Sequence, residues 1–224
     1  MITETPLLLL REMNEKDLPD LREILQDPVA MTAYEGAFDE AMVLDWLDRQ
    51  LQRYARDGMG LWAVIRKEDG AFLGQCGLTW QQTPDGQVPE IGYLFKRRFW
   101  HQGWATRAFF ACLDYGFAQK GFSKLYSIIR DTNLASQRVA QRGGMVPVGG
   151  FVKQYRGVEM PHLLYCIDRQ TWLRNRPAAR TPSHAPVRRP NASFRPNDPA
   201  LRAGRAPFPR APANSSRPAG NGRR

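Results

Sequence analysis

The residues best suited to chemistry lie where a predicted strand leads into a predicted helix, between Glu90 and Thr106. The N-terminus of a helix presents unpaired N–H groups and the positive end of the helix dipole, which together bind phosphate or pyrophosphate. Gly103 has no side chain and would let the backbone approach such an anion closely. Ala105 is small, and the hydroxyl of Thr106 adds a hydrogen-bond donor. The segment therefore predicts an anion site at the start of this helix.

Three basic residues, Lys96, Arg97 and Arg98, come just before this turn. Their charges suit a polyanionic ligand. Taken alone, the segment is equally compatible with an ordinary turn beside a solvated basic cluster. A second polar motif, Asn133-Leu134-Ala135-Ser136, follows the next predicted strand and is closed by Gly143-Gly144-Met145.

Hydrophobic spacing and turn residues predict the elements that must position these motifs. We expect a strand at 7–12, a helix between Asn14 and Asp27, a helix at 39–56, and strands at 61–66, 72–80 and 90–95. A helix at 105–120, a strand at 124–130, a helix at 134–142 and strands at 145–154 and 162–168 follow. This order predicts an α/β fold with a mixed, mostly antiparallel sheet and helices on both faces.

Many short segments in one order resemble the GNAT family of N-acetyltransferases, in the branch that includes enzymes acetylating the N-termini of ribosomal proteins. The resemblance covers about residues 5–170. The segments that carry it include Leu61-Trp62-Ala63-Val64, Phe72-Leu73-Gly74-Gln75-Cys76-Gly77-Leu78, Ile91-Gly92-Tyr93-Leu94, Trp100-His101-Gln102-Gly103-Trp104-Ala105-Thr106, and Asn133 with Ser136.

The resemblance implies that a central strand pair splays apart and that acetyl-CoA binds in the gap. Backbone groups near Leu94 and Phe95 would pair with the pantetheine arm, and Asn133 and Ser136 would lie near the thioester. The acceptor amine would attack the thioester directly. The pyrophosphate would be held by the turn and first residues of the helix, namely His101, Gln102, Gly103, Trp104 and Ala105, with Thr106 beside them.

An amine is mostly protonated at neutral pH, so this reaction needs a general base. Glu90 is the leading candidate, and the alternative is a solvated carboxylate at a strand end. Glu35 and Asp39 are weaker candidates in a loop that would border the acceptor pocket. The departing thiolate needs a proton, which Ser136 would supply directly or through water, unless Ser136 only caps its helix.

Two positions depart from the family pattern. Many members carry a tyrosine as general acid on the short helix, where this chain has Ala140. Many also have a glutamate where this chain has Arg107, which either adds a phosphate contact or has no role. Trp80, at a strand end near the expected cleft, is either a core residue or part of the ligand wall.

Charge and composition divide the chain at residue 175. Residues 176–224 contain 11 of the 32 basic residues, one of the 22 acidic residues and 10 of the 17 prolines. Residues 1–175 therefore carry no net formal charge. We predict a GNAT-like domain at 1–175 and a disordered basic tail at 176–224. The tail is either an extension without function or a weak electrostatic contact for nucleic acid or anionic lipid.

The remaining composition indicates a soluble, cytoplasmic protein, and the family resemblance implies a monomer or a homodimer. Cys76, Cys112 and Cys166 form no C-x-x-C pair and are expected to be buried free thiols. No apolar run is long enough to cross a bilayer, and no cluster has metal-ligand spacing.

Three functions remain open. The first is acetyl-CoA-dependent acetylation of a primary amine, either a protein N-terminus or a small molecule. The second is a CoA-binding regulatory module without turnover. The third is a nucleic-acid-associated protein that acts through its arginine-rich tail.

Overall fold

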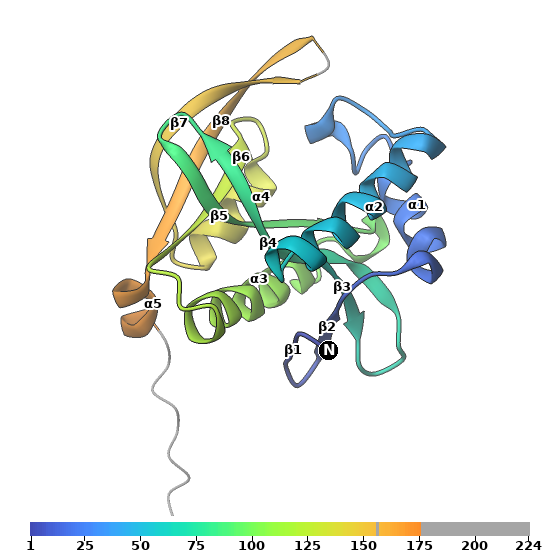
Figure 1. Ribbon diagram of the computed structural model, residues 1–224, viewed down its shortest axis with the longest axis horizontal. Helices are drawn as coiled ribbons and strands as arrows, with labels where there is room; N and C mark the ends of the chain where they lie inside the picture. The colour runs from blue at the N-terminus through green and yellow to red at the C-terminus, as the bar shows by residue number, and fades with distance from the viewer. Residues whose placement is uncertain (156, 176–224) are drawn as a thin grey trace, which may run out of the picture. The chain divides into compact units, whose positions relative to one another are not determined.

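The computed structural model describes residues 1–155 and 157–175. The described residues form one eight-stranded sheet with the order β1-β2-β3-β4-β5-β6-β8-β7 (Figure 1). The strands are β1 Thr3–Glu4, β2 Leu8–Arg11, β3 Leu61–Arg66, β4 Phe72–Thr83, β5 Gly86–Phe95, β6 Lys124–Arg130, β7 Val146–Tyr155 and β8 Val158–Asp168. The predicted tail lies outside the described residues.

Every neighbouring strand pair is antiparallel except β5 and β6, which are parallel. The α3 helix connects these two strands, as a parallel pair requires a crossover. The sheet is therefore mixed and mostly antiparallel, which confirms the predicted fold class. The last two strands form a hairpin, and β8 rather than β7 pairs with β6.

Helices cover both faces of the sheet. They are α1 Leu18–Leu25, α2 Glu40–Asp57, α3 Trp104–Asp114, α4 Leu134–Arg142 and α5 Arg169–Asn175. Alternate side chains of a strand point to opposite faces, so β3 contributes to two cores. Its Trp62 and Val64 pack in the core that contains α3 and α4 residues, and Ala63 packs in the core of α1 and α2.

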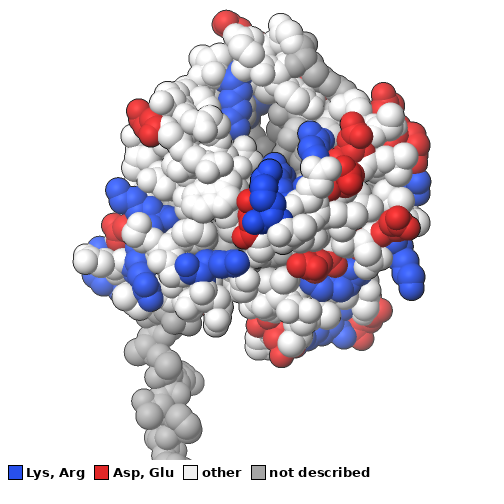
Figure 2. Space-filling view, in the orientation of Figure 1, with Lys and Arg blue, Asp and Glu red and all other residues white. Residues whose placement is uncertain are grey.

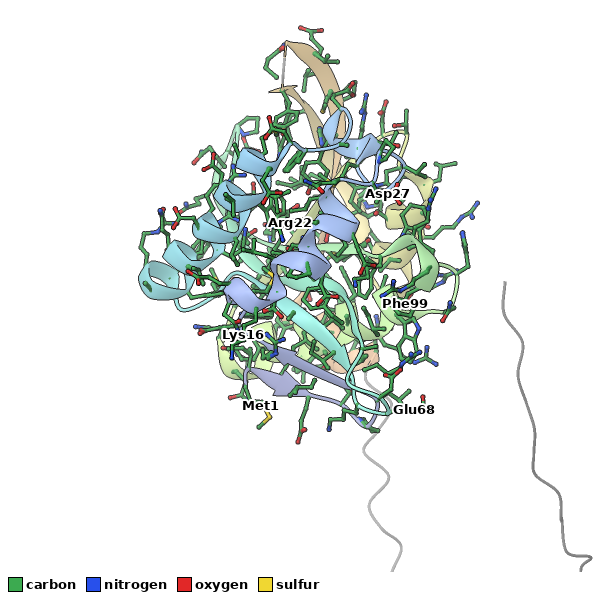
Figure 3. The ribbon with its side chains drawn as sticks, turned by 90° about the vertical axis from the view of Figure 1, so that its right-hand side faces the viewer. Met1, Lys16, Arg22, Asp27, Glu68 and Phe99 are labelled. Carbon is green, nitrogen blue, oxygen red and sulfur yellow. The ribbon has the colours of Figure 1, made fainter. Side chains whose placement is uncertain are left out.

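The α1 and α2 helices are joined at the surface as well as in their core. Arg22 of α1, labelled in Figure 3, forms an ion pair with Glu40 at the start of α2, with 2.6 Å between the nitrogen and the oxygen. Asp39 caps α2 by accepting a hydrogen bond from the Met42 amide at 2.8 Å. The α2 helix and the segment between α1 and α2 line one side of the cavity described below.

The structure contains elements that the sequence did not predict. These are the short strand β1 and the C-terminal helix α5, whose Trp172 stacks on Phe117 with 5.1 Å between ring centroids. The three cysteines are buried, as predicted, and the sulfur atoms of Cys76 and Cys112 lie 3.4 Å apart. No helix in the described part of the chain is long and apolar enough to span a membrane.

Candidate active site

The β5 and β6 strands separate almost as soon as they meet. Their ladder contains one residue pair, Glu90 with Tyr126. Beyond it, side chains replace the ladder: the Glu90 carboxylate accepts a hydrogen bond from the Ile128 amide at 2.9 Å, and the Ser127 hydroxyl donates to the Ile91 carbonyl at 2.9 Å. These two bonds fix the point at which the strands diverge, which is the splayed pair that the sequence resemblance implied.

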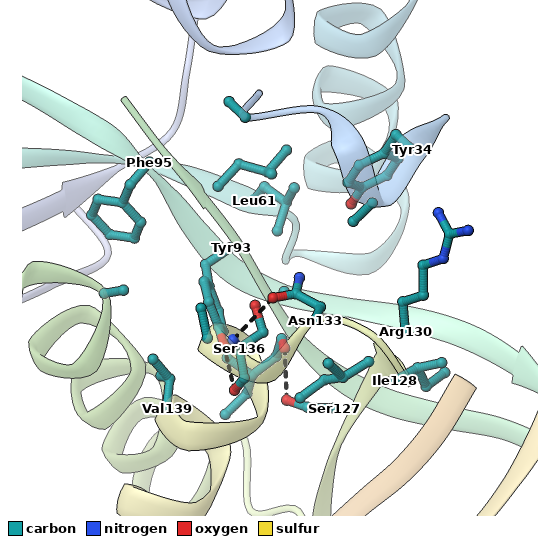
Figure 4. Close-up of a pocket in the computed structure, with 18 of the residues that line it drawn as sticks. Tyr34, Leu61, Tyr93, Phe95, Ser127, Ile128, Arg130, Asn133, Ser136 and Val139 are labelled. Atoms are coloured by element: carbon teal, nitrogen blue, oxygen red, sulfur yellow. Dashed lines mark hydrogen bonds between the residues drawn. The ribbon is translucent and has the colours of Figure 1, made fainter. Parts of the chain in front are cut away.

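A cavity of about 1540 Å³ opens where the strands diverge. Figure 4 shows part of its lining, with Tyr93 and Phe95 from β5, Ser127 and Arg130 from β6, and the start of α4. All the residues predicted to bind the cofactor line it, as does the predicted base: Glu90, Leu94, Phe95, His101, Gln102, Gly103, Trp104, Ala105, Thr106, Asn133 and Ser136. Phe95 also accepts one hydrogen bond at its carbonyl, from the Trp100 indole at 2.8 Å.

The start of α3 has the features of an anion site. Gly103 is the N-cap residue, with φ of 80°, and no side chain caps the helix. The preceding turn holds His101 at φ of 60°, a left-handed conformation that costs energy for a residue with a side chain. No side chain accepts a hydrogen bond from the first-turn amides of α3, which lie at the cavity. These amides are therefore available to bind a negatively charged group of a ligand.

The basic residues Lys96, Arg97 and Arg98 do not line the cavity, which disfavours the interpretation that they bind a polyanionic ligand. Lys96 is 2% exposed and forms ion pairs with Asp20 and Glu23 of α1. Arg97 pairs with Asp27 and Arg98 with Glu23. These three residues attach the β5–α3 turn to α1 and to Asp27, which follows α1, and thereby position the turn.

Other arginines do line the cavity, and those on the side of α3 and α4 are Arg107 of α3 and Arg138 and Arg142 of α4. Arg107 donates a hydrogen bond to the Gln102 carbonyl at 3.1 Å and lies over the Trp104 ring at 5.2 Å. Arg138 and Arg142 were missed in the sequence, although a spacing of four residues places them on one helix face. These three guanidinium groups place positive charge on the side of the cavity formed by α3 and α4.

Asn133 is the N-cap residue of α4. Its side-chain oxygen accepts a hydrogen bond from the Ser136 amide at 3.1 Å. The idea that Ser136 caps the helix is therefore wrong. The Ser136 carbonyl accepts a hydrogen bond from the Tyr93 hydroxyl at 3.0 Å (Figure 4), and the Ser136 side chain also interacts with that hydroxyl.

Comparison with known proteins identifies the family to which the chain belongs. Residues 8–146, more than half of the chain, match the family model described as an acetyltransferase (GNAT) domain. The chain belongs to the GNAT acetyltransferase family. This confirms the resemblance inferred from the sequence.

Three similar proteins illustrate the extent of the match. The uncharacterized protein YkkB of Bacillus subtilis is 41% identical over 142 residues, which are 63% of this chain and 83% of YkkB. The ribosomal-protein-S5-alanine acetyltransferase structure from Vibrio fischeri has a TM-score of 0.61 and 17% identity, over 76% of this chain and 97% of that one. The spermidine N-acetyltransferase of Vibrio cholerae, solved with CoA and spermine, has a TM-score of 0.61 and 18% identity, over 74% and 98% of the two chains.

Within this GNAT domain, Glu90 is the carboxylate nearest the point where the strands diverge. Burial raises its pKa above the usual value of a glutamate. Lys153, the Ile128 amide and Arg53 oppose that rise because each favours the charged form. A carboxylate with a raised pKa that remains close to a cavity is suited to proton transfer.

The other candidate bases of the GNAT domain are engaged elsewhere. Glu35 lines the cavity but forms an ion pair with Arg130. Asp39 caps α2 and does not line the cavity. Trp80 packs against Phe122, with 5.6 Å between ring centroids, and is not part of the cavity wall.

Ala140, the position at which the sequence resemblance placed the tyrosine of many family members, is fully buried in the core. A different tyrosine, Tyr93 of β5, brings its hydroxyl to α4 at Ser136. In the sequence, Tyr93 stands out only as part of a segment shared with the family. Neither its spacing nor its residue type shows which helix its hydroxyl would reach.

Proposed function

We propose that this chain transfers the acetyl group of acetyl-CoA to a primary amine by direct attack of the neutral amine on the thioester. The observation that supports this proposal is that a possible anion site and a possible general base line the same cavity, which opens between β5 and β6. An uncapped helix N-terminus with arginines lies along one part of it, and the Glu90 carboxylate lies at the point where the strands diverge.

The cavity residues fit an acyl-CoA in their chemistry. The amides from His101 to Ala105, in the turn before α3 and its first residues, would hold the pyrophosphate together with Thr106, and Arg107, Arg138 and Arg142 would add charge for the phosphates. Backbone groups at Leu94 and Phe95 would bind the pantetheine arm. The volume of about 1540 Å³ leaves room for a second substrate. Acetyl-CoA supplies the acyl group as an activated thioester.

The chain's own residues would manage the protons. Glu90 would accept a proton from the acceptor ammonium or amine, directly or through water. Ser136, whose side chain interacts with the Tyr93 hydroxyl, would donate a proton to the departing sulfur, and Asn133 would hold Ser136 in place by accepting a hydrogen bond from the Ser136 amide. Neither residue forms a covalent bond with the acetyl group.

A direct test is release of free CoA thiol from acetyl-CoA by the full chain in the presence of primary amines. Mass spectrometry of the acceptor should show the addition of one acetyl group. Thiol release that depends on the amine supports the proposal. Tight binding of acetyl-CoA without turnover of any peptide or small amine would instead indicate a regulatory CoA-binding module. Absence of binding would contradict both.

A further inference from the structure

The cavity has a second charged wall that the proposed acyl transfer does not use. Arg49 and Arg53 of α2 and Lys153 of β7 line it. None of the three forms an ion pair with an acidic side chain of the described residues. In Figure 2 a hollow in the surface is flanked by Lys and Arg side chains.

The contacts of these side chains are neutral. Arg49 donates to the Asp45 carbonyl at 3.2 Å and lies over the Trp46 ring at 5.6 Å. Arg53 donates to the Gln50 side-chain oxygen at 3.3 Å. The ammonium of Lys153 lies 5.8 Å from the centre of the Phe151 ring.

Acidic groups are scarce at this wall. Glu35 and Glu90 are the carboxylates that line the cavity within the described residues. Glu35 is already neutralised by Arg130. Burial also favours the protonated form of Glu90 and raises its pKa. The positive charges of Lys153 and Arg53 oppose this rise, but less strongly than burial causes it. The region around Glu90 is therefore an electropositive pocket, although residues 1–175 as a whole carry no net formal charge.

We propose that the acceptor amine carries a carboxylate group close to its nitrogen, and that Arg49, Arg53 and Lys153 bind this carboxylate. This inference rests on the proposed acetyl transfer and names the substrate class of that site. Arginine and lysine form strong, charge-assisted hydrogen bonds with carboxylates. Two sources share this chemistry, a free acidic amino acid and a peptide with acidic residues after its N-terminus.

The same positive wall would help the reaction. Like charges disfavour a protonated amine, so the pocket lowers the pKa of a bound ammonium and favours the neutral nucleophile. A polyamine would bring several positive charges into this pocket and would be rejected. The wall therefore selects the acceptor by charge and also prepares its amine for attack.

The experiment compares four acceptors with the full chain and acetyl-CoA. They are the amidated peptides Ala-Glu-Glu-Ala, Ala-Gln-Gln-Ala and Ala-Arg-Arg-Ala, and free glutamate. Turnover is measured as thiol release, and binding of each N-acetylated product is measured separately by calorimetry in the presence of CoA. We expect kcat/KM for the acidic peptide or for glutamate to exceed that of the Gln peptide by about tenfold.

Three variants locate the effect. Arg49→Gln and Lys153→Gln should each remove most of the preference for the acidic acceptor and leave acetyl-CoA binding unchanged. Arg56→Gln is the matched control, because Arg56 lies on the same helix, pairs with Asp57 and does not line the cavity. All variants keep the basic residues of 176–224, so attraction of acidic peptides to that segment is common to every measurement.

The outcomes separate this inference from the proposed function. Equal turnover of the three peptides, with no gain for glutamate, would overturn the inference and leave acetyl transfer standing. A preference that survives in Arg49→Gln and Lys153→Gln would overturn it as well. Selective binding of the acidic product without any turnover would support the anionic pocket and contradict acetyl transfer. A gain for glutamate alone would identify a free amino acid as the source, and a gain for the acidic peptide alone would identify a peptide.

Discussion

The substitution Glu90→Gln should abolish most of the activity while keeping the local structure. Glutamine retains a side-chain oxygen that can accept the hydrogen bond now received from the Ile128 amide at 2.9 Å. It cannot take a proton from the acceptor. General base catalysis contributes on the order of 10²–10⁴-fold in rate, which corresponds to about 3–5 kcal/mol in the activation barrier.

The effect on stability should have the opposite sign. Burial raises the pKa of Glu90 in the folded chain above its value in the unfolded chain. Ionisation of this group therefore opposes folding at neutral pH, and this penalty is absent below the unfolded pKa. Glutamine removes the penalty, so the melting temperature at pH 7 should stay the same or rise. Glu90→Ala is the contrasting variant, because it leaves the Ile128 amide without its partner and should cost about 1–3 kcal/mol in folding stability.

The assay is steady-state thiol release over a range of pH, combined with thermal unfolding. In the wild type, kcat/KM should fall as the pH drops through the raised pKa of Glu90, and this acid limb should be absent in Glu90→Gln. A rate within fivefold of the wild type (about 1 kcal/mol by the same relation) would show that Glu90 is not the base. A loss of melting temperature in parallel with activity would show a structural role instead.

Four further changes test other parts of the site. Ser136→Ala should lower kcat by about 10²-fold or more and leave the Kd for acetyl-CoA unchanged, as calorimetry can show; an unchanged kcat would remove Ser136 from the mechanism. Lys153→Gln removes a positive charge that lowers the pKa of Glu90, so the acid limb of the pH–rate profile should move to higher pH, and a shift to lower pH would refute the coupling. Arg142→Gln should raise the Kd for acetyl-CoA by about tenfold through loss of a phosphate contact. Lys96→Met should weaken acetyl-CoA binding only together with a loss of melting temperature, because Lys96 holds the turn through its ion pairs with α1 and does not line the cavity; a higher Kd at an unchanged melting temperature would instead support a direct contact of Lys96 with the ligand.

Much of the fold was predictable because its signals are local. The α2 helix, predicted at 39–56, covers Glu40–Asp57 with Asp39 as its N-cap. The strands β3 and β4, predicted at 61–66 and 72–80, pair as antiparallel neighbours. The β4–β5 hairpin extends further than predicted, to Thr83 and Gly86, because its polar end with Gln81 and Gln82 gives no hydrophobic alternation.

The position of the cavity residues along the chain was also predictable, but their partners were not. The left-handed Gly103 and the start of α3 follow from a strand-to-helix turn with glycine. The role of the basic residues Lys96 to Arg98 could not be predicted because a charge run does not show which way its side chains point. Asp20 and Glu23, which neutralise Lys96, lie on α1, far away in sequence.

The electropositive acceptor wall could not be predicted for the same reason. Arg49, Arg53 and Lys153 come from α2 and β7, two elements that are far apart in sequence and meet only across the cavity. The overall charge balance of residues 1–175 concealed this local excess. A pocket lined mainly by positive side chains can be recognised in a domain of zero net charge only when the tertiary structure shows which residues lie together.

The most direct test of the account is calorimetric titration of acetyl-CoA into the full chain and into Gly103→Glu. Glutamate at this position would place a side chain and a negative charge at the uncapped start of α3. Gly121→Glu is the matched control, because Gly121 has a similar left-handed φ of 71°, open space around its Cα and no place in the cavity wall. The account predicts micromolar binding (on the order of 8 kcal/mol) by the wild type and Gly121→Glu, and none by Gly103→Glu. Equal binding by all three proteins, or no binding by the wild type, would contradict the assignment of this cavity to acetyl-CoA.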